Sequence, residues 1–270
     1  VRDTLNDSSL YGHASKPILV NWKPGGNSWG TTANGGSDAS IRTAAQNVKA
    51  LGSRKIMLAL WHEPENDNVN ATGVTITGNC KRPTGSNGSA AEYRKMWQRV
   101  YDVFKQEGVS NVVWVWNPMG WVGNDGKTGW ACIENDMYPG DHIVDWIMWD
   151  PYSSDHGDFD GSVEDFYNCL TKNSLATGKN KHGLSQNYLS KPWGLAEFGS
   201  NSDPAKAIGY YQEGIRVIGR KWSENKFPNI KLYSIFDTIS NGGTNGGLRV
   251  GYNNLGKIDV AELERAADAA

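Results

Sequence analysis

The chain has 270 residues and a formal net charge of −2, so acidic and basic side chains nearly balance. A chain of this length can bury a large core, and a single barrel domain commonly reaches this size. The sequence contains no basic block, so we expect neither nucleic acid nor an anionic membrane surface as a partner. It also contains no apolar run long enough to span a membrane and no recognisable signal peptide.

Apolar runs and their spacing predict an alternation of strands and helices along the chain. The first 15 residues are polar, and we expect no barrel strand there. Strands are expected at residues 18–22, from 56 to about 60, and at 111–116, 144–149, 193–197 and 230–236. Helices are expected at about 38–51, 89–108, 162–172 and 203–222, with a C-terminal helix from about residue 259. A Gly-rich loop is expected from Gly25 to Gly36.

The helix that follows Ser89 has the clearest start and end. Ser89-Ala90-Ala91-Glu92 has the pattern of a capping box, in which a serine and a glutamate bond each other's backbone N–H groups. Apolar side chains then recur on one face as far as Phe104, and Gly108 is a typical stop. We therefore expect an amphipathic helix that covers a sheet.

Polar residues follow the strands rather than the helices, which favours an α/β fold with a parallel sheet. A doubly wound fold usually carries a Gly-rich phosphate turn, but Gly25-Gly26 and Gly242-Gly243 lack its spacing. The prediction is a (β/α)8 TIM barrel in a single domain, residues 1–270. Six strands are evident in the sequence, whereas a closed barrel needs eight.

Two glutamates follow buried strands and are the first candidates for chemistry. Glu63 comes after the apolar run that begins at Ile56, and Glu197 lies at the end of a second run. Pro64 is expected to hold Glu63 in an extended conformation. Because active-site residues of barrels lie at the carboxyl ends of the strands, both carboxyl groups are expected to line one cleft. Such a pair is what glycoside hydrolysis requires.

Several segments together resemble glycoside hydrolase family 26. They are Trp61-His62-Glu63, the helix 93–104, residues 111–117, Tyr138-Pro139-Gly140-Asp141, residues 144–146 with Asp150-Pro151-Tyr152, and Leu195-Ala196-Glu197-Phe198-Gly199. The resemblance implies that Glu63 is the acid/base at the end of barrel strand four and Glu197 the nucleophile of strand seven. It also implies that Ile18 begins strand three, so that strands one and two have no counterpart in this sequence.

The resemblance implies an endo-acting, retaining β-glycoside hydrolase that needs no cofactor and acts on a polysaccharide. The best-known members of the family are β-mannanases, and β-1,4-mannan is the first expectation. Mannanases of the family usually follow the acid/base glutamate with Asn-Gly and tryptophans, whereas Pro64-Glu65-Asn66-Asp67 follow here. β-1,3-Xylan and mixed-linkage β-glucan therefore stay open as alternatives. We also expect a secreted monomer.

Two other functions are alternatives to this one. A barrel that only binds glycans would not need both glutamates. An unrelated barrel hydrolase using metal or phosphate chemistry is disfavoured by the scattered histidines and by the missing phosphate loop. We expect no metal site.

Residues near the two glutamates are candidates for substrate binding. Tyr152 is expected to donate a hydrogen bond to Glu197, or else to pack at the rim. Glu65 is expected in a loop or at the rim rather than as a third catalyst. The other polar candidates, each with an alternative structural role, are His62, Lys23, Asn117, Asp150 and Asp237.

Tryptophans are numerous, at 12 in the chain, and several follow strands. Their rings are candidates for sugar stacking, although each has core packing as its alternative. The candidates are Trp22, Trp61, Trp116, Trp121 and Trp149, and Trp29 in the Gly-rich loop is a further one.

Three cysteines leave one without a partner in any pairing. Cys80 and Cys132 lie in long polar segments after strands, and we expect a disulfide between them. Cys169 lies in a predicted helix and is expected to be a small buried side chain. Three reduced thiols are the alternative.

Overall fold

The structure is a computed structural model of the chain. It describes residues 17–67, 86–120, 136–152, 159–199, 209–210, 213–214 and 226–235. Some predictions concern residues outside these ranges. They are the absence of a strand before Ser15, the bridge between Cys80 and Cys132, the roles of Trp121 and Asp237, and the C-terminal helix.

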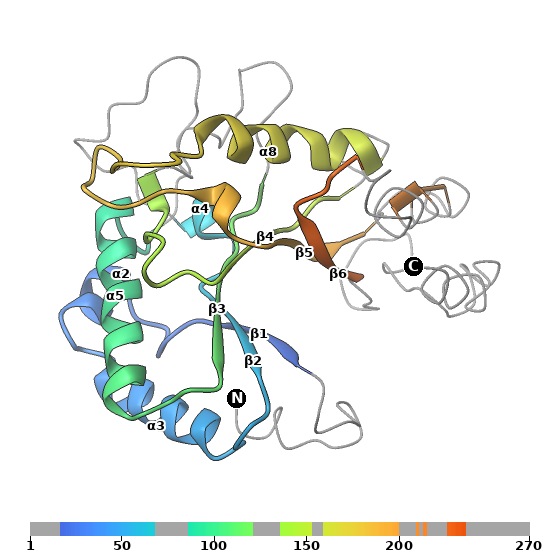
Figure 1. Ribbon diagram of the computed structural model, residues 1–270. Helices are drawn as coiled ribbons and strands as arrows, with labels where there is room; N and C mark the ends of the chain where they lie inside the picture. Colours follow the sequence, from blue (N-terminus) through green and yellow to red (C-terminus); the bar gives the residue numbers. More distant parts are fainter. Residues whose placement is uncertain are drawn as a thin grey trace.

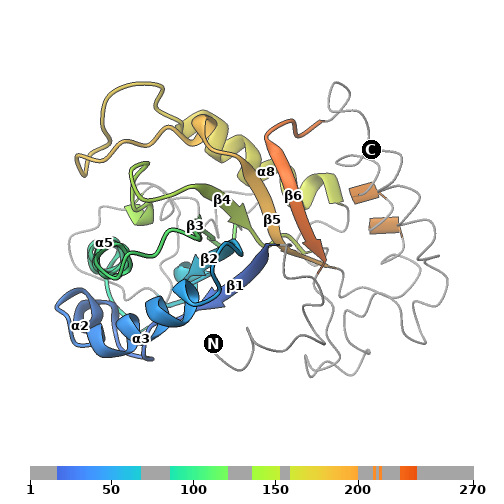
Figure 2. The ribbon, with the colours of Figure 1, turned by 60° about the horizontal axis from the view of Figure 1, so that its bottom comes forward.

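Six parallel strands form one curled sheet, which has the shape of an incomplete barrel (Figures 1 and 2). The strands are β1 (Ile18–Trp22), β2 (Ile56–Leu60), β3 (Val112–Trp116), β4 (Trp146–Trp149), β5 (Trp193–Phe198) and β6 (Ile230–Ile235). Each strand pairs in parallel with the next one along the chain. The α/β class and the partial barrel are therefore confirmed.

The two faces of the sheet have different side chains because neighbours on a strand point in opposite directions. On β1, Ile18 and Val20 belong to the main core between the sheet and its helices, whereas Leu19 packs in a smaller inner cluster. Asn21 follows on the inner face. The inner cluster also contains Ala59 and Ala196, whose small side chains leave room around the strand tips.

The helices lie outside the curl of the sheet (Figure 1). The long helices are α3 (Asp38–Lys49), α5 (Ala90–Gln106) and α8 (Phe159–Asn173). The short ones are α2 (Trp29–Ala33), α4 (Pro64–Asp67) and η1 (Tyr188–Ser190). The predicted capping box is present: the side chains of Ser89 and Glu92 each bond the other's backbone N–H.

The structure differs from the predicted elements mainly at their ends and in short helices. The predicted loop Gly25 to Gly36 contains α2, which is capped by Ser28 through a bond from Thr31 N. Helix α8 begins at Phe159, three residues before the predicted start. Of the helix predicted at 203–222, residues 209–210 and 213–214 are described, and they are helical. Cys169 is half-buried on α8 and packs against the core.

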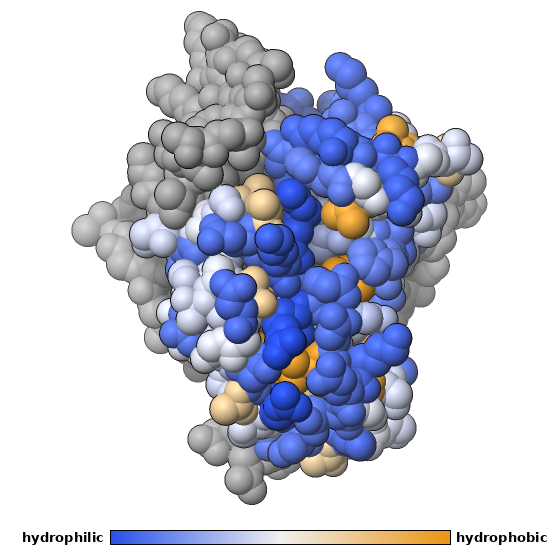
Figure 3. Space-filling model, turned by 90° about the vertical axis from the view of Figure 1, so that its left-hand side faces the viewer, coloured by the Kyte–Doolittle hydropathy of each residue, from blue (hydrophilic) through white to orange (hydrophobic). Residues whose placement is uncertain are grey.

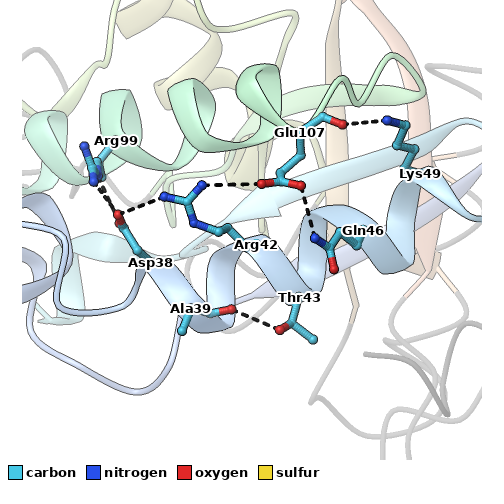
Figure 4. Close-up of polar contacts among 8 residues, drawn as sticks. All are labelled: Asp38, Ala39, Arg42, Thr43, Gln46, Lys49, Arg99 and Glu107. Atoms are coloured by element: carbon cyan, nitrogen blue, oxygen red, sulfur yellow. Dashed lines mark hydrogen bonds and ion pairs between the residues drawn. The ribbon is translucent and has the colours of Figure 1, made fainter.

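A polar network joins α3 to α5 (Figure 4). At the start of α3, Asp38 accepts hydrogen bonds from Arg99, and these bonds lower the pKa of Asp38. At the end of α5, Glu107 accepts from Arg42 and Gln46. The start of α3 thus meets the middle of α5, and later turns of α3 meet its end, so the two helices run in the same direction. Figure 3 shows that the neighbouring surface is mostly hydrophilic, as expected for helices with one apolar face.

Candidate active site

Polar side chains gather at the carboxyl ends of the strands. Strand β2 leads directly into Trp61, His62 and Glu63, and Glu197 lies near the end of β5. Because all strands are parallel, these tips share one edge of the sheet. The charge of Glu197 acts on both His62 and Glu63, so the structure brings the predicted pair of glutamates into one site.

The presence of Pro64 predicted an extended backbone at Glu63, but the backbone there is not extended. Its φ is +49°, in the left-handed region, and helix α4 begins at Pro64. A following proline disfavours the right-handed helical region for the residue before it but leaves more than one alternative. Here the hydrogen bond from Glu63 N to Asn117 O, of 2.8 Å, fixes the left-handed alternative. The prediction of an extended Glu63 is wrong for this reason.

The carboxyl group of Glu63 is in a position to hold a proton near neutral pH. Burial raises its pKa to about 7, and the nearby charge of Glu197 contributes in the same direction. Lys23 opposes this shift.

Both carboxyl oxygens of Glu197 accept hydrogen bonds from neighbouring strand ends. The Tyr152 hydroxyl donates to Oε2 at 2.7 Å, as predicted, and Asn21 Nδ2 donates to Oε1 at 3.3 Å. Tyr152 is held at the sheet by a parallel bridge to Gly199. Two donors on one carboxylate fix its orientation and stabilise its negative charge.

Asn21 was not among the residues predicted for the site. Its position was nevertheless visible in the pattern: Asn21 is two residues after Leu19 and so shares its inner face at the carboxyl end of β1. An amide on the inner face of a barrel strand tip is a signal that alternation alone could have raised.

Asn117 and Asp150 bond to one another, while the Oδ1 atom of each is buried without a hydrogen-bond partner in the described part of the chain. Asn117 Nδ2 donates to Asp150 Oδ2 at 2.8 Å, and the exposed fractions of the two residues are 0% and 3%. Burial and the charges of Glu197 and Glu63 raise the pKa of Asp150 well above its usual range. Direct contact of either residue with a sugar hydroxyl stays a prediction.

His62 and Lys23 lie beside Glu63. Burial lowers the pKa of His62, although Glu197 opposes the shift. Lys23 Nζ donates to Asp67 at 2.9 Å and lies 5.3 Å from the centre of the Trp61 ring. Trp61 Nε1 donates to the same oxygen of Asp67 at 2.7 Å. Asp67 therefore holds both the Lys23 ammonium group and the Trp61 ring in place. It was not among the residues predicted for the site.

Glu65 is not a loop or rim residue, contrary to the prediction. It lies in α4 with an exposed fraction of 0%, and both of its carboxyl oxygens accept from Met119 N at 3.0 Å. The prediction is wrong because charged side chains after a proline usually face solvent, whereas α4 places the Glu65 carboxyl group in the interior, against the backbone of Met119.

For most candidate tryptophans the core alternative holds. Trp116 is stacked on Tyr188, Trp149 packs edge-on against Phe166, and neither has an exposed surface. Trp61 and Trp29 pack against one another and are buried as well. These four rings offer no free face to a sugar. Trp22 is half-buried against Phe104 of α5, so its role as a platform stays a prediction.

Within the described ranges, no cluster of three or more His, Cys, Asp or Glu side chains could hold a metal ion. None of the helices in the same ranges is both long and apolar enough to cross a membrane.

The parallel half-barrel and the two glutamates at its strand tips have the arrangement expected of a barrel glycoside hydrolase. Residues 83–208 match the model of Glycosyl hydrolase family 26. This part of the chain is therefore similar to that family.

The chain is also similar to several known proteins in sequence or in structure. Endoglucanase H of Acetivibrio thermocellus is 28% identical over 137 residues, which are 50% of this chain and 14% of that protein. A modular endo-β-1,4-mannanase from Cellulomonas fimi has a TM-score of 0.56 at 17% identity. The match covers 100% of this chain and 56% of the mannanase chain. A family 26 β-mannanase from Bacteroides ovatus has a TM-score of 0.53 at 17% identity, and the match covers 98% of this chain and 72% of the mannanase chain. At these identities the two structures show a shared fold.

Proposed function

We propose that the chain is the catalytic barrel of a retaining, endo-acting β-glycoside hydrolase. The observation that carries the proposal is the pair of unlike glutamates at the tips of β2 and β5. Glu63 has a pKa raised to about 7, whereas Glu197 is bonded by two donors. One carboxyl group is thus suited to give a proton and the other to carry negative charge.

In this mechanism Glu197 attacks the anomeric carbon while Glu63 protonates the leaving glycosidic oxygen. The bond to the leaving oxygen breaks, and a glycosyl–enzyme ester forms on Glu197. Glu63 then takes a proton from a water molecule, which attacks the same carbon and releases the sugar with its original configuration. Retention requires the two carboxyl groups to be about 5–5.5 Å apart, and we expect that separation when substrate is bound.

β-1,4-Mannan is the substrate that we propose first. The endo-β-1,4-mannanase from C. fimi, which shares the fold, supports this choice. The name of Endoglucanase H supports β-glucan as a second candidate. The segment Pro64 to Asp67 replaces the residues usual after the acid/base glutamate in mannanases, so β-1,3-xylan also belongs in the test. Secretion and a monomeric state are part of the proposal, since such polymers lie outside the cell.

The test is a panel of mannan, glucomannan, β-1,3-xylan and mixed-linkage glucan, with product lengths and product anomers followed over time. The proposal expects internal cleavage of one polymer with retained configuration by NMR. Inverted products would overturn the retaining mechanism. Affinity for a polymer without turnover would instead indicate a barrel that only binds glycans.

A further inference from the structure

Glu65 is a buried carboxyl group that the proposed mechanism does not use. It lies two residues after Glu63 and is fully buried, at the start of α4. Carboxyl groups are rarely buried to this degree unless something pairs with them. Its partners therefore indicate what it does.

The partners of Glu65 are backbone groups of the segment that follows β3. Met119 N donates to both carboxyl oxygens at 3.0 Å each, and the N–H of Gly120 also bonds to the group. Glu65 thus accepts from two successive backbone N–H groups in the segment Asn117–Gly120. Without an acceptor there, each N–H would be left without a hydrogen bond at a cost of about 1–3 kcal/mol.

The same segment holds the backbone of the catalytic acid and the tip of β4. Asn117 O accepts from Glu63 N at 2.8 Å, and Met119 O accepts from Asp150 N at 3.3 Å. A Cβ atom at Gly120 would lie 2.6 Å from the Trp149 ring, so the segment is packed closely against β4. Glu65 is therefore bonded to the element that fixes Glu63.

Glu63 needs such support because its conformation is uncommon. Its φ of +49° lies in a region that glutamate seldom occupies. Residues in sparsely populated backbone regions persist only where their surroundings hold them there. The loop formed by Glu63, Pro64, Glu65 and the segment Asn117–Gly120 is closed by hydrogen bonds at both of its ends.

We propose that Glu65 is a positioning residue for the proton donor: its carboxyl group fixes the segment Asn117–Gly120, which in turn holds Glu63 in its left-handed conformation. The proposal rests on the function proposed above, since it assigns Glu63 the role of acid/base. Glu65 touches no substrate in this role and acts only through Glu63.

The electrostatics agree with a structural link between the two glutamates. Burial raises the pKa of Glu65 to about 8, with a contribution from the charge of Glu63 and opposition from the N–H donors of Met119 and Gly120. The carboxyl group of Glu65 also acts on Tyr93 and on Asp150. It therefore belongs to the cluster of groups at the strand tips and not to a separate surface.

The test compares two aryl glycosides of the sugar that the panel identifies, one with a good leaving group and one with a poor leaving group. Only the poor leaving group needs a proton from Glu63. In Glu65→Gln, a side-chain NH2 would face the backbone donors, so the segment should shift. We expect kcat/KM to fall roughly 10²-fold on the poor leaving group, the loss typical of a misplacement near 1 Å, and less than about tenfold on the good one.

Asp145→Asn is the matched control. Asp145 Oδ2 accepts from the backbone N–H of Trp114 at 2.8 Å, in the middle of β3 and directly before β4 begins, away from the strand tips. The control should lose thermal stability without changing the ratio of the two activities. Equal losses on both substrates in Glu65→Gln, or no loss, would overturn the proposal.

Two further outcomes keep the test decisive. If Glu65→Gln does not fold, Glu65→Asp keeps the carboxyl group but shortens its reach by one methylene. The ratio of the two activities is then measured in that variant, with the same expectation. A wild-type enzyme that hydrolyses neither glycoside nor any polymer would overturn the proposed function, and this inference with it. An active wild type with an unchanged ratio in the variants would overturn the role of Glu65 alone.

Discussion

The hydroxyl group of Tyr152 donates a 2.7 Å hydrogen bond to Oε2 of Glu197, and Asn21 donates to the other oxygen of the same carboxyl group. The three residues come from β5 and from the ends of β4 and β1. The orientation of Glu197 therefore depends on strands that lie on both sides of the site. This dependence gives the first prediction.

Tyr152→Phe should lower kcat by about 10- to 100-fold, because a hydrogen bond to a charged group contributes roughly 1.5–3 kcal/mol. Steady-state kinetics on the identified polymer measure the loss. Tyr138→Phe is the control, since the Tyr138 hydroxyl also donates to a carboxylate, Asp141, at 2.7 Å but before β4 begins. Equal losses in both variants would mean that Tyr152 serves only stability.

Glu197→Ala should abolish turnover on every substrate, because no other group can form the glycosyl ester. Added azide or formate should restore part of the activity on an activated aryl glycoside by filling the vacated space and attacking the sugar. The product of rescue, identified by NMR, should be an azide or formate adduct of inverted configuration. Near-normal activity of the variant without any additive would contradict the assignment.

Glu63→Ala should be most harmful with poor leaving groups and mild with activated aryl glycosides, which need no proton. In the wild type, the pKa of about 7 for Glu63 has a related consequence. The proton donor is lost as the pH rises through 7, so kcat/KM on the poor leaving group should fall above this pH. A pH profile of the wild type and of Glu63→Ala on both substrate types measures this. A basic limb that persists unchanged in the variant would speak against Glu63.

The raised pKa values also predict how stability depends on pH. Glu63 and Glu65 have folded-state pKa values of about 7 and about 8, above the value of 4.5 expected when unfolded. Between those limits the folded state binds more protons, so the stability that these groups contribute is present below pH 4.5 and is lost as the pH rises. The free energy of unfolding should therefore decrease from pH 5 to pH 8, by at most about 1.4 kcal/mol per pH unit for each group.

Urea unfolding of the wild type and of Glu63→Gln at pH 5, 6, 7 and 8 checks this expectation. The variant lacks one of the two titrating groups, so its dependence should be shallower, most clearly up to pH 7. A wild-type stability that rises over this interval would show that other groups dominate.

The sequence predicted the elements whose signals are local. The apolar run from Ile56 and the capping box at Ser89 each depend on a few consecutive residues, and both are present. The short helix α2 was missed because five residues carry too little periodicity, and its Ser28 cap lies among glycines that favour a loop.

Site residues could be predicted from the sequence where they directly follow a strand. They could not be predicted where tertiary contacts determine the backbone conformation or the burial of a side chain. Glu63, Glu197 and the bond from Tyr152 belong to the first kind. The left-handed backbone of Glu63 and the inward turn of Glu65 belong to the second, since both depend on the segment after β3. The tryptophans were ambiguous because the same position after a strand suits either a sugar or the core.

The strand order β1 to β6 follows the chain without any exchange of neighbours. Each strand consequently depends for its backbone hydrogen bonds only on the units immediately before and after it, as in a solenoid. Within the described sheet, opening should therefore begin at β1 and β6 and move inward, and amide hydrogen exchange should be slowest in β3 and β4. Glu63 follows β2 and Glu197 lies on β5, and each of these strands is one in from an edge of the described sheet. Loosening of either outer strand would therefore reach a reacting group before it reached the middle of the sheet.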